Sequence, residues 1–139
     1  MRLFGHPIHV MLIHFPIALW PAHGLLHLFS AQLPAGVGSI AGFWLLAAGT
    51  ALGWIAAFCG GADLLAIWGE QDKPRLTAGL IHGSLNGSVL IGFTALFVSE
   101  YARYPAIAHG AAFLAIEAWL ILMMFVGNYF GASLIWKKA

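Results

Sequence analysis

Four long apolar stretches, separated by short breaks that are polar or contain proline, make up most of the chain. A helix needs about 20 consecutive apolar residues to cross a bilayer. The stretches cover residues 7–31, 37–68, 76–100 and 106–136. Because the breaks are short, neighbouring helices are expected to run antiparallel. The pattern predicts an all-α integral membrane protein, a single domain built as an up-down bundle of four transmembrane helices.

Composition agrees with this class and excludes others. Of 139 residues, 61% are hydrophobic and 8% are charged, and the formal net charge is only +1. The chain therefore lacks the basic surface on which nucleic acid releases its counterions. The single Cys59 can form no internal disulfide, and there is no cysteine pair for zinc, an iron-sulfur cluster or c-type haem. Lipid is the expected environment, and nucleic acid is not an expected partner.

Positive charge is concentrated on one side of the predicted bundle. The side that holds both termini carries Arg2, Lys73, Arg75, Lys137 and Lys138. The opposite side carries only Arg103. Cytoplasmic loops of membrane proteins are enriched in Lys and Arg. This asymmetry predicts that both termini are cytoplasmic.

Histidine is the unusual feature of the composition, since seven His exceed the six Lys plus Arg and the five Asp plus Glu. Imidazole is the commonest metal ligand in proteins, so the excess indicates a cofactor. Small residues form ridges in the predicted helices, with Gly79, Gly83 and Gly87 on the third. Such a ridge permits close helix packing, and it can also admit a flat macrocycle.

Two histidine-proline motifs begin the chain, Gly5 to His9 and His14 to Trp20. Further motifs are Gly61-Ala62-Asp63, Arg75, His82 to Asn86, Gly127 to Gly131 and Leu134-Ile135-Trp136. Together they resemble the bacterial membrane family known as domain of unknown function 2231, over nearly the whole chain. The resemblance implies four transmembrane helices in the bacterial inner membrane. It also implies a redox setting, because members are sometimes joined to Rieske or cytochrome c domains.

The chain departs from the family pattern at two positions. Val10 stands where the family often has Pro, and His27 stands where it often has Asp. The second departure adds an imidazole at the end of the first helix opposite the termini, so this chain is expected to hold something that typical relatives do not.

His14 and His82 lie at similar depths, on the order of 10 Å inside the predicted first and third helices. These helices are diagonal in an up-down bundle, so the two imidazoles are predicted to ligate one haem b from both sides. Pro16 is expected to kink the helix beside His14. The alternative is that the two histidines are separate hydrogen-bond donors between helices.

Other residues near this depth are candidates for a supporting role. Asn86 follows His82 by one helical turn on the same face. Asp63 is expected to orient a ligand, or to pair with Arg75 while Arg75 anchors a haem propionate. The alternative is a simple ion pair between Asp63 and Arg75 or Lys73. His9 lies about 7.5 Å along the axis from His14, so a role as substitute ligand stays open for it.

A second group of histidines, His23, His27 and His109, lies toward the opposite end. It could hold a second haem or a quinone, or bind a partner subunit. Glu117 is an intramembrane carboxylate that is expected to be neutral or hydrogen-bonded inside the bundle. A proton-relay role lacks a chain of nearby acids in the sequence.

These features predict a small b-type haem subunit that relays electrons within a respiratory or other redox complex, with other membrane subunits as partners. The alternative is a non-redox structural or assembly subunit whose His and Gly residues mediate helix packing. A transporter is disfavoured, because four helices show no inverted repeat. No hydrolytic motif is present, so catalysis by this chain alone is not expected.

Overall fold

The structure is a computed structural model that describes residues 2–3, 6–105 and 110–136. Its elements are β1 (Arg2–Leu3), β2 (His6–Pro7), α1 (Ile8–Leu12), α2 (His14–Leu28), the short 3-10 helix η1 (Ser30–Gln32), α3 (Val37–Gly69), α4 (Lys73–Tyr101) and α5 (Ala111–Trp136). Within these ranges, four helical segments are long and apolar enough to cross a membrane, with α1 and α2 together forming the first. The prediction of a four-helix transmembrane bundle is confirmed.

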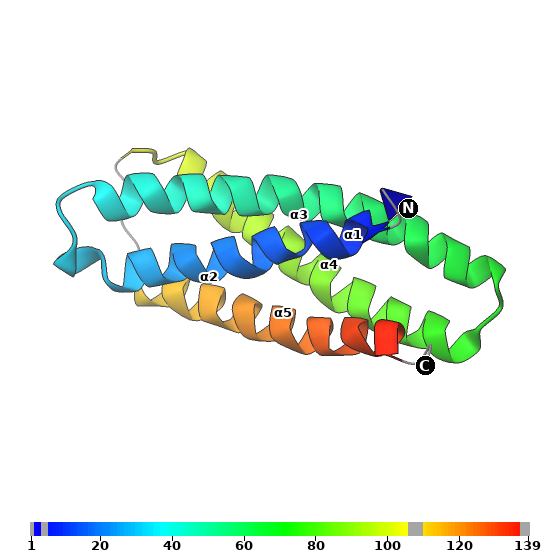
Figure 1. Cartoon of the computed structure of the whole chain (residues 1–139). Coiled ribbons are helices and arrows are strands. Elements are labelled where there is room, and N and C mark those ends of the chain that lie inside the picture. Colours follow the sequence, from blue (N-terminus) through cyan, green and yellow to red (C-terminus); the bar gives the residue numbers. More distant parts are fainter. Residues whose placement is uncertain (1, 4–5, 106–109, 137–139) are drawn as a thin grey trace.

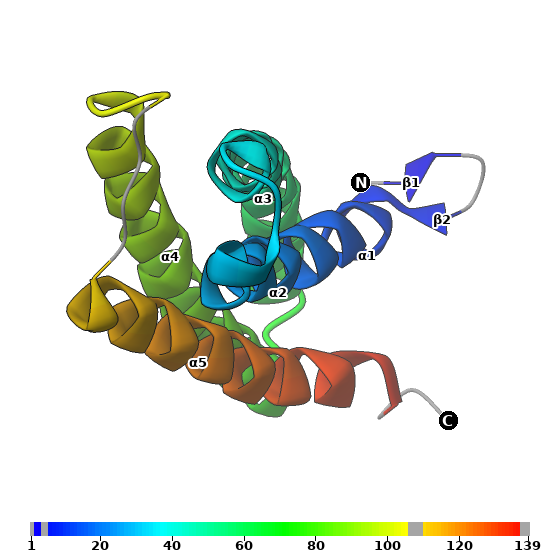
Figure 2. The ribbon, with the colours of Figure 1, turned by 90° about the vertical axis from the view of Figure 1, so that its left-hand side faces the viewer.

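The helices form a closed ring in which α2 and α4 each pack against both α3 and α5. α2 and α4 are therefore diagonal to each other. The start of α1, the α3–α4 turn and the end of α5 lie at one end of the bundle, on the right in Figure 1. We call this the terminal end, and we call the end with η1 and the start of α5 the opposite end. Figure 2 shows the bundle from the opposite end, with the small β1–β2 hairpin projecting beyond α1.

The N-terminal segment differs from the single helix predicted over residues 7–31. It begins with the hairpin, in which Leu3 pairs with His6, because a residue that precedes proline favours an extended backbone. The helix is then interrupted at Ile13, between α1 and α2. Pro16 has no N–H to donate to the carbonyl of Leu12, and this explains the break beside His14.

The other helix boundaries shift for local reasons. α4 starts at Lys73 rather than at residue 76, because the Asp72 side chain caps it by accepting the Arg75 backbone N–H at 3.2 Å and a proline occupies the first turn. α5 starts at Ala111 rather than at residue 106, since Gly110 lies outside the helix. The rest of the predicted start, residues 106–109, lies outside the described residues.

The core fills the middle of the bundle. Trp20 of α2 stacks on Phe93 of α4 across the diagonal, with ring centroids 4.1 Å apart, and Leu46 and Met124 pack around this pair. Large apolar side chains such as Phe58 cover the outer faces of the helices. A soluble protein rarely exposes so much apolar surface, whereas a bilayer solvates it.

Close helix packing at Gly49 gives a stability prediction. A Cβ atom there would lie 2.9 Å from Cδ1 and Nε1 of Trp20 and would push α2 away from α3. We expect Gly49→Ala to destabilise the purified protein by about 1–3 kcal/mol, as overpacked cores do. Gly61→Ala on the same helix is the matched control, because its Cβ would meet no atom within 4 Å. Thermal unfolding in detergent measures both variants, and equal midpoints would contradict the packing account.

Candidate functional site

The described residues of the bundle form two histidine sites, one toward each end, and each bridges the diagonal. At the terminal end His9 of α1 meets His82 of α4, and we call this the His9–His82 site. At the opposite end His23, His27, Glu100 and Glu117 form what we call the His23 cluster.

His9 is held against α3. Its Nδ1 donates a hydrogen bond to the carbonyl oxygen of Ala56 at 2.7 Å. The ring can approach this closely because residue 60 is glycine: a Cβ there would lie 2.8 Å from His9 Nδ1. The orientation of the His9 ring is therefore set by backbone groups of α3.

His82 is held against α5 in the same way. Its Nδ1 donates to the carbonyl oxygen of Gly127 at 2.9 Å. Because this nitrogen carries the proton, the Asn86 amide donates instead to the backbone oxygen of His82, at 3.1 Å. Cβ atoms at Gly127 and Gly131 would lie 2.4 Å from Asn86 Nδ2 and 2.6 Å from His82 Nδ1. These two glycines let α5 approach both side chains.

The two rings lie nearly perpendicular, at 84°, with centroids 5.9 Å apart. Since each neutral ring uses Nδ1–H for a backbone carbonyl, Nε2 is the nitrogen that keeps its lone pair. Nitrogens that ligate one metal from opposite sides lie about 4 Å apart, because each bond is about 2 Å long. The centroid separation of 5.9 Å places the two rings next to each other across the diagonal.

The structure places His9, and not His14, beside His82. His14 lies at the start of α2 with its side chain exposed, and the imidazole in contact with His82 is that of His9. Depth along the helix was a poor guide here, because position around the axis decides which side chain faces inward. Nine residues from His14 to the buried His23 rotate the helix by about half a turn, which leaves His14 on the outer face.

Arg75 and Asp63 lie in the same half of the bundle. Arg75 Nη1 donates to Glu70 Oε2 at 2.9 Å, and its Nε lies 3.9 Å from Asp72 Oδ2. Arg75 thus secures the turn between α3 and α4. Asp63 is half-buried on α3, six residues before the helix ends at Gly69.

Three glycines in this half of the bundle have no close neighbour, and two of them, Gly61 and Gly83, are exposed. Cβ atoms added at Gly61, Gly83 or Gly87 would have no neighbour within 4 Å. Gly83 and Gly87 are one turn apart on α4 and follow His82 directly. By contrast Gly79, the first residue of the predicted ridge, packs against Leu64. The ridge is thus close-packed at one end and open at the other two positions.

The His23 cluster is almost fully buried. His23 Nε2 lies 2.8 Å from Glu100 Oε1 of α4, and its Nδ1 contacts Glu117 Oε1 of α5. His27 lies on the next turn of α2, with its ring centroid 4.0 Å from that of His23 and its Nδ1 3.9 Å from Glu100 Oε1. His23 and Glu100 are 0% exposed, Glu117 is 1% exposed and His27 is 5% exposed.

Sequence reasoning missed half of this cluster. It grouped His23 and His27 but assigned Glu100 to the end of a helix and found no acid near Glu117. The signal was present, because an acidic residue within an apolar span is costly unless a partner satisfies it. His109, the third predicted member, lies outside the described residues.

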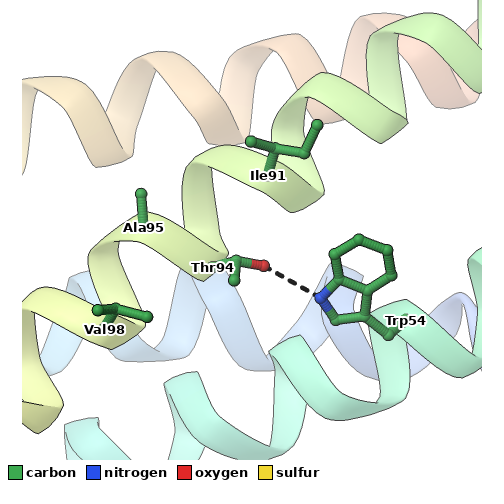
Figure 3. Close-up of a pocket in the computed structure, with 5 residues that line it drawn as sticks. All are labelled: Trp54, Ile91, Thr94, Ala95 and Val98. Carbon is green, nitrogen blue, oxygen red and sulfur yellow. Dashed lines mark hydrogen bonds between the residues drawn. The ribbon is translucent and has the colours of Figure 1, made fainter.

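A shallow apolar groove on the α3–α4 seam contains no titratable group. It is lined by Trp54, Ile91, Thr94, Ala95 and Val98 (Figure 3). Its two polar groups satisfy each other, since Trp54 Nε1 donates to Thr94 Oγ1 at 3.1 Å. The groove therefore presents an apolar surface that lipid can cover. Among the described residues, the histidines that contact one another lie in the two histidine sites.

The fold and the paired histidines define a four-helix integral membrane protein with polar sites inside the bundle. Comparison with known families identifies it further. The family model "Predicted membrane protein (DUF2231)" matches residues 5–139, and the chain belongs to this family. No curated protein and no solved structure matches the chain.

Proposed function

We propose that the protein is a small b-type haem subunit that relays electrons within the membrane, with His9 and His82 as the axial ligands of one haem. The observation that carries the proposal is the His9–His82 pair: two imidazoles from diagonal segments, each with Nδ1 fixed by a backbone carbonyl. Metal-ligating histidines characteristically donate a hydrogen bond from their other ring N–H to a carbonyl or carboxylate oxygen.

The surroundings of the pair fit a flat group. Gly60, Gly127 and Gly131 bring the helix backbones close to the two rings and to Asn86. Gly83 and Gly87, which lie on α4 just after His82, carry no side chain that would obstruct a flat group there. Haem b needs no covalent cysteine attachment, which agrees with a chain whose single cysteine is Cys59.

Each residue has a specific task in this proposal. His9 and His82 supply two neutral nitrogen ligands, and the carbonyls of Ala56 and Gly127 keep the rings in that tautomer. When bound, haem supplies a one-electron couple, and two axial imidazoles leave no open position for oxygen. Asp63 and Arg75 remain candidates for contact with the propionates.

The proposed setting is a bacterial inner membrane, in a complex with other membrane subunits. The apolar outer faces contact lipid, and the described chain has little extramembrane surface on which a soluble partner could dock. Electrons would therefore pass to and from cofactors of neighbouring subunits or a quinone.

Orientation gives a separate prediction. Both ends of the chain are expected in the cytoplasm, because five of the six Lys and Arg belong in the sequence to the N-terminus, the α3–α4 turn or the C-terminus. A green fluorescent protein fused after Ala139 should fluoresce, and a phosphatase at the same position should be inactive. Fusions in the turn after Gln32 should give the reverse pattern. Phosphatase activity from the Ala139 fusion would contradict the orientation.

A visible spectrum tests the haem proposal. Protein purified from haem-supplied cells is expected to show a b-type spectrum whose α and Soret bands sharpen on reduction with dithionite. A protein without haem bands would favour the structural-subunit alternative, in which the hydrogen bonds of His9, His82 and Asn86 serve only to hold helices together.

A further inference from the structure

The His23 cluster carries two carboxylates in the interior of a membrane protein. Glu100 and Glu117 come from different helices and are 0% and 1% exposed. Arg103, the cation nearest to Glu100 in the sequence, is exposed and donates to Ser99 Oγ at 2.6 Å. With neutral imidazoles the four cluster side chains carry two negative charges, which is costly inside a membrane. Protons or a divalent cation can neutralise them.

The hydrogen bonding of His23 favours a cation at one particular place. Its Nε2–H donates to Glu100 at 2.8 Å. A neutral imidazole then has a lone pair on Nδ1, and Nδ1 faces Glu117 Oε1, which is also an acceptor. Two acceptors in contact require a positively charged atom between them. This atom is a proton in the metal-free protein and can be replaced by a metal ion, since metal ligands must be deprotonated.

The donor set around that position is complete enough to hold an ion. One ligand atom each from His23, His27 and Glu117 lie within 4.8 Å of one another. In a tetrahedral site with bonds of about 2.05 Å the ligand atoms are about 3.3 Å apart. His23 Nδ1 and Glu117 Oε1, which are in hydrogen-bond contact, would therefore move apart to admit the ion, and His27 would supply the third ligand atom from within 4.8 Å. Glu117 Oε2 is buried without a hydrogen-bond partner among the described residues, and it is a further donor for the ion.

Two glycines bring the helix backbones close to the cluster. A Cβ at Gly24 would lie 3.1 Å from Glu117 Oε1, and one at Gly42 would lie 2.6 Å from His27 Nε2. Side chains at these positions would displace Glu117 and His27. The cluster therefore occupies a space that the packing of α2, α3 and α5 leaves for it.

We propose that the His23 cluster binds one divalent first-row transition-metal ion through His23 Nδ1, His27 and Glu117, with Glu100 orienting His23 through its Nε2–H. Imidazole together with carboxylate suits zinc, iron or manganese. In such sites the second ring nitrogen of a ligating histidine usually donates a hydrogen bond to a carboxylate, which fixes the orientation of the ring. A haem does not suit the cluster, because His23 and His27 are adjacent on one helix with centroids 4.0 Å apart.

The test is Zn²⁺ binding to detergent-purified protein after treatment with a chelator. Wild type is expected to bind one Zn²⁺ per chain tightly and to release a proton, which calorimetry in buffers of different ionisation enthalpy detects. Glu117→Gln and His27→Ala should each weaken binding at least about 100-fold, and Glu100→Gln should weaken it about 10–100-fold, as loss of an outer support does.

Two control variants separate this site from the other histidines. His82→Ala removes the other site, and His14→Ala removes an exposed imidazole, so both should bind Zn²⁺ at the cluster as wild type does. Size-exclusion chromatography verifies that each variant folds. If Glu117→Gln fails to fold, His27→Ala still tests the site, because it leaves the hydrogen bonds of His23 to both glutamates in place. The proposal is overturned if wild type binds no Zn²⁺, or if Glu117→Gln and His27→Ala bind it unchanged. The cluster would then be neutralised by protons alone.

Discussion

Replacing His23 by Leu is expected to destabilise the protein by about 3–5 kcal/mol, the cost of breaking a buried ion pair from one side. His23 bonds Glu100 and Glu117 at the same time, so its loss removes the shared partner of two carboxylates in the bundle interior. Thermal or denaturant unfolding in detergent measures the change. We also expect lower yields of folded protein from membranes.

The controls for this substitution separate charge from packing. His14→Leu changes an exposed histidine on the same helix and should leave the midpoint within about 0.5 kcal/mol of wild type. Adding Glu100→Gln and Glu117→Gln to His23→Leu should restore much of the stability, since no carboxylate then remains buried without its partner. A His23→Leu protein as stable as wild type would contradict the account of the cluster.

Replacing His9 by Ala is expected to convert the haem spectrum from six-coordinate and low-spin to five-coordinate. In the proposed site His9 and His82 would occupy both axial positions, so the reduced wild-type protein should bind carbon monoxide poorly. Loss of His9 opens one position, and carbon monoxide should then shift the Soret band of most of the haem. His82→Ala should show the same change or lose haem altogether, because it also removes the bond to Gly127.

His14→Ala is the matched control, because it removes an imidazole five residues away whose side chain is exposed. It should retain the wild-type spectrum and remain unreactive toward carbon monoxide. The opposite result would contradict the assignment. If His14→Ala gains carbon monoxide binding and His9→Ala does not, His14 is the ligand.

The fold was largely predictable because its main determinant is local. Apolar length and short breaks predict four antiparallel helices, and lipid permits few other arrangements. The exceptions also have local causes that hydropathy does not register: an aspartate cap ahead of Lys73, a glycine before Ala111 and an extended residue ahead of Pro7. Hydropathy measures the length of a span and not the hydrogen bonds that end it.

The sites were less predictable because they depend on rotation about helix axes. Sequence gives the depth of His14 and His82, but the break at Ile13 changes which face of the segment points inward. His9 reaches His82 because α1 packs against α3 beside Gly60. The His23 cluster joins residues up to 94 positions apart, and no periodicity in the chain indicates that Glu100 and Glu117 share one histidine.

The central claim is that His9 and His82 together hold one haem b. The most direct measurement is the haem content per chain, from reduced-minus-oxidised spectra, of wild type and of the His9→Ala/His82→Ala double variant purified side by side. We predict one haem per wild-type chain and none in the folded double variant. Equal haem in both proteins, or a wild type without haem after expression with ample haem, would contradict the claim.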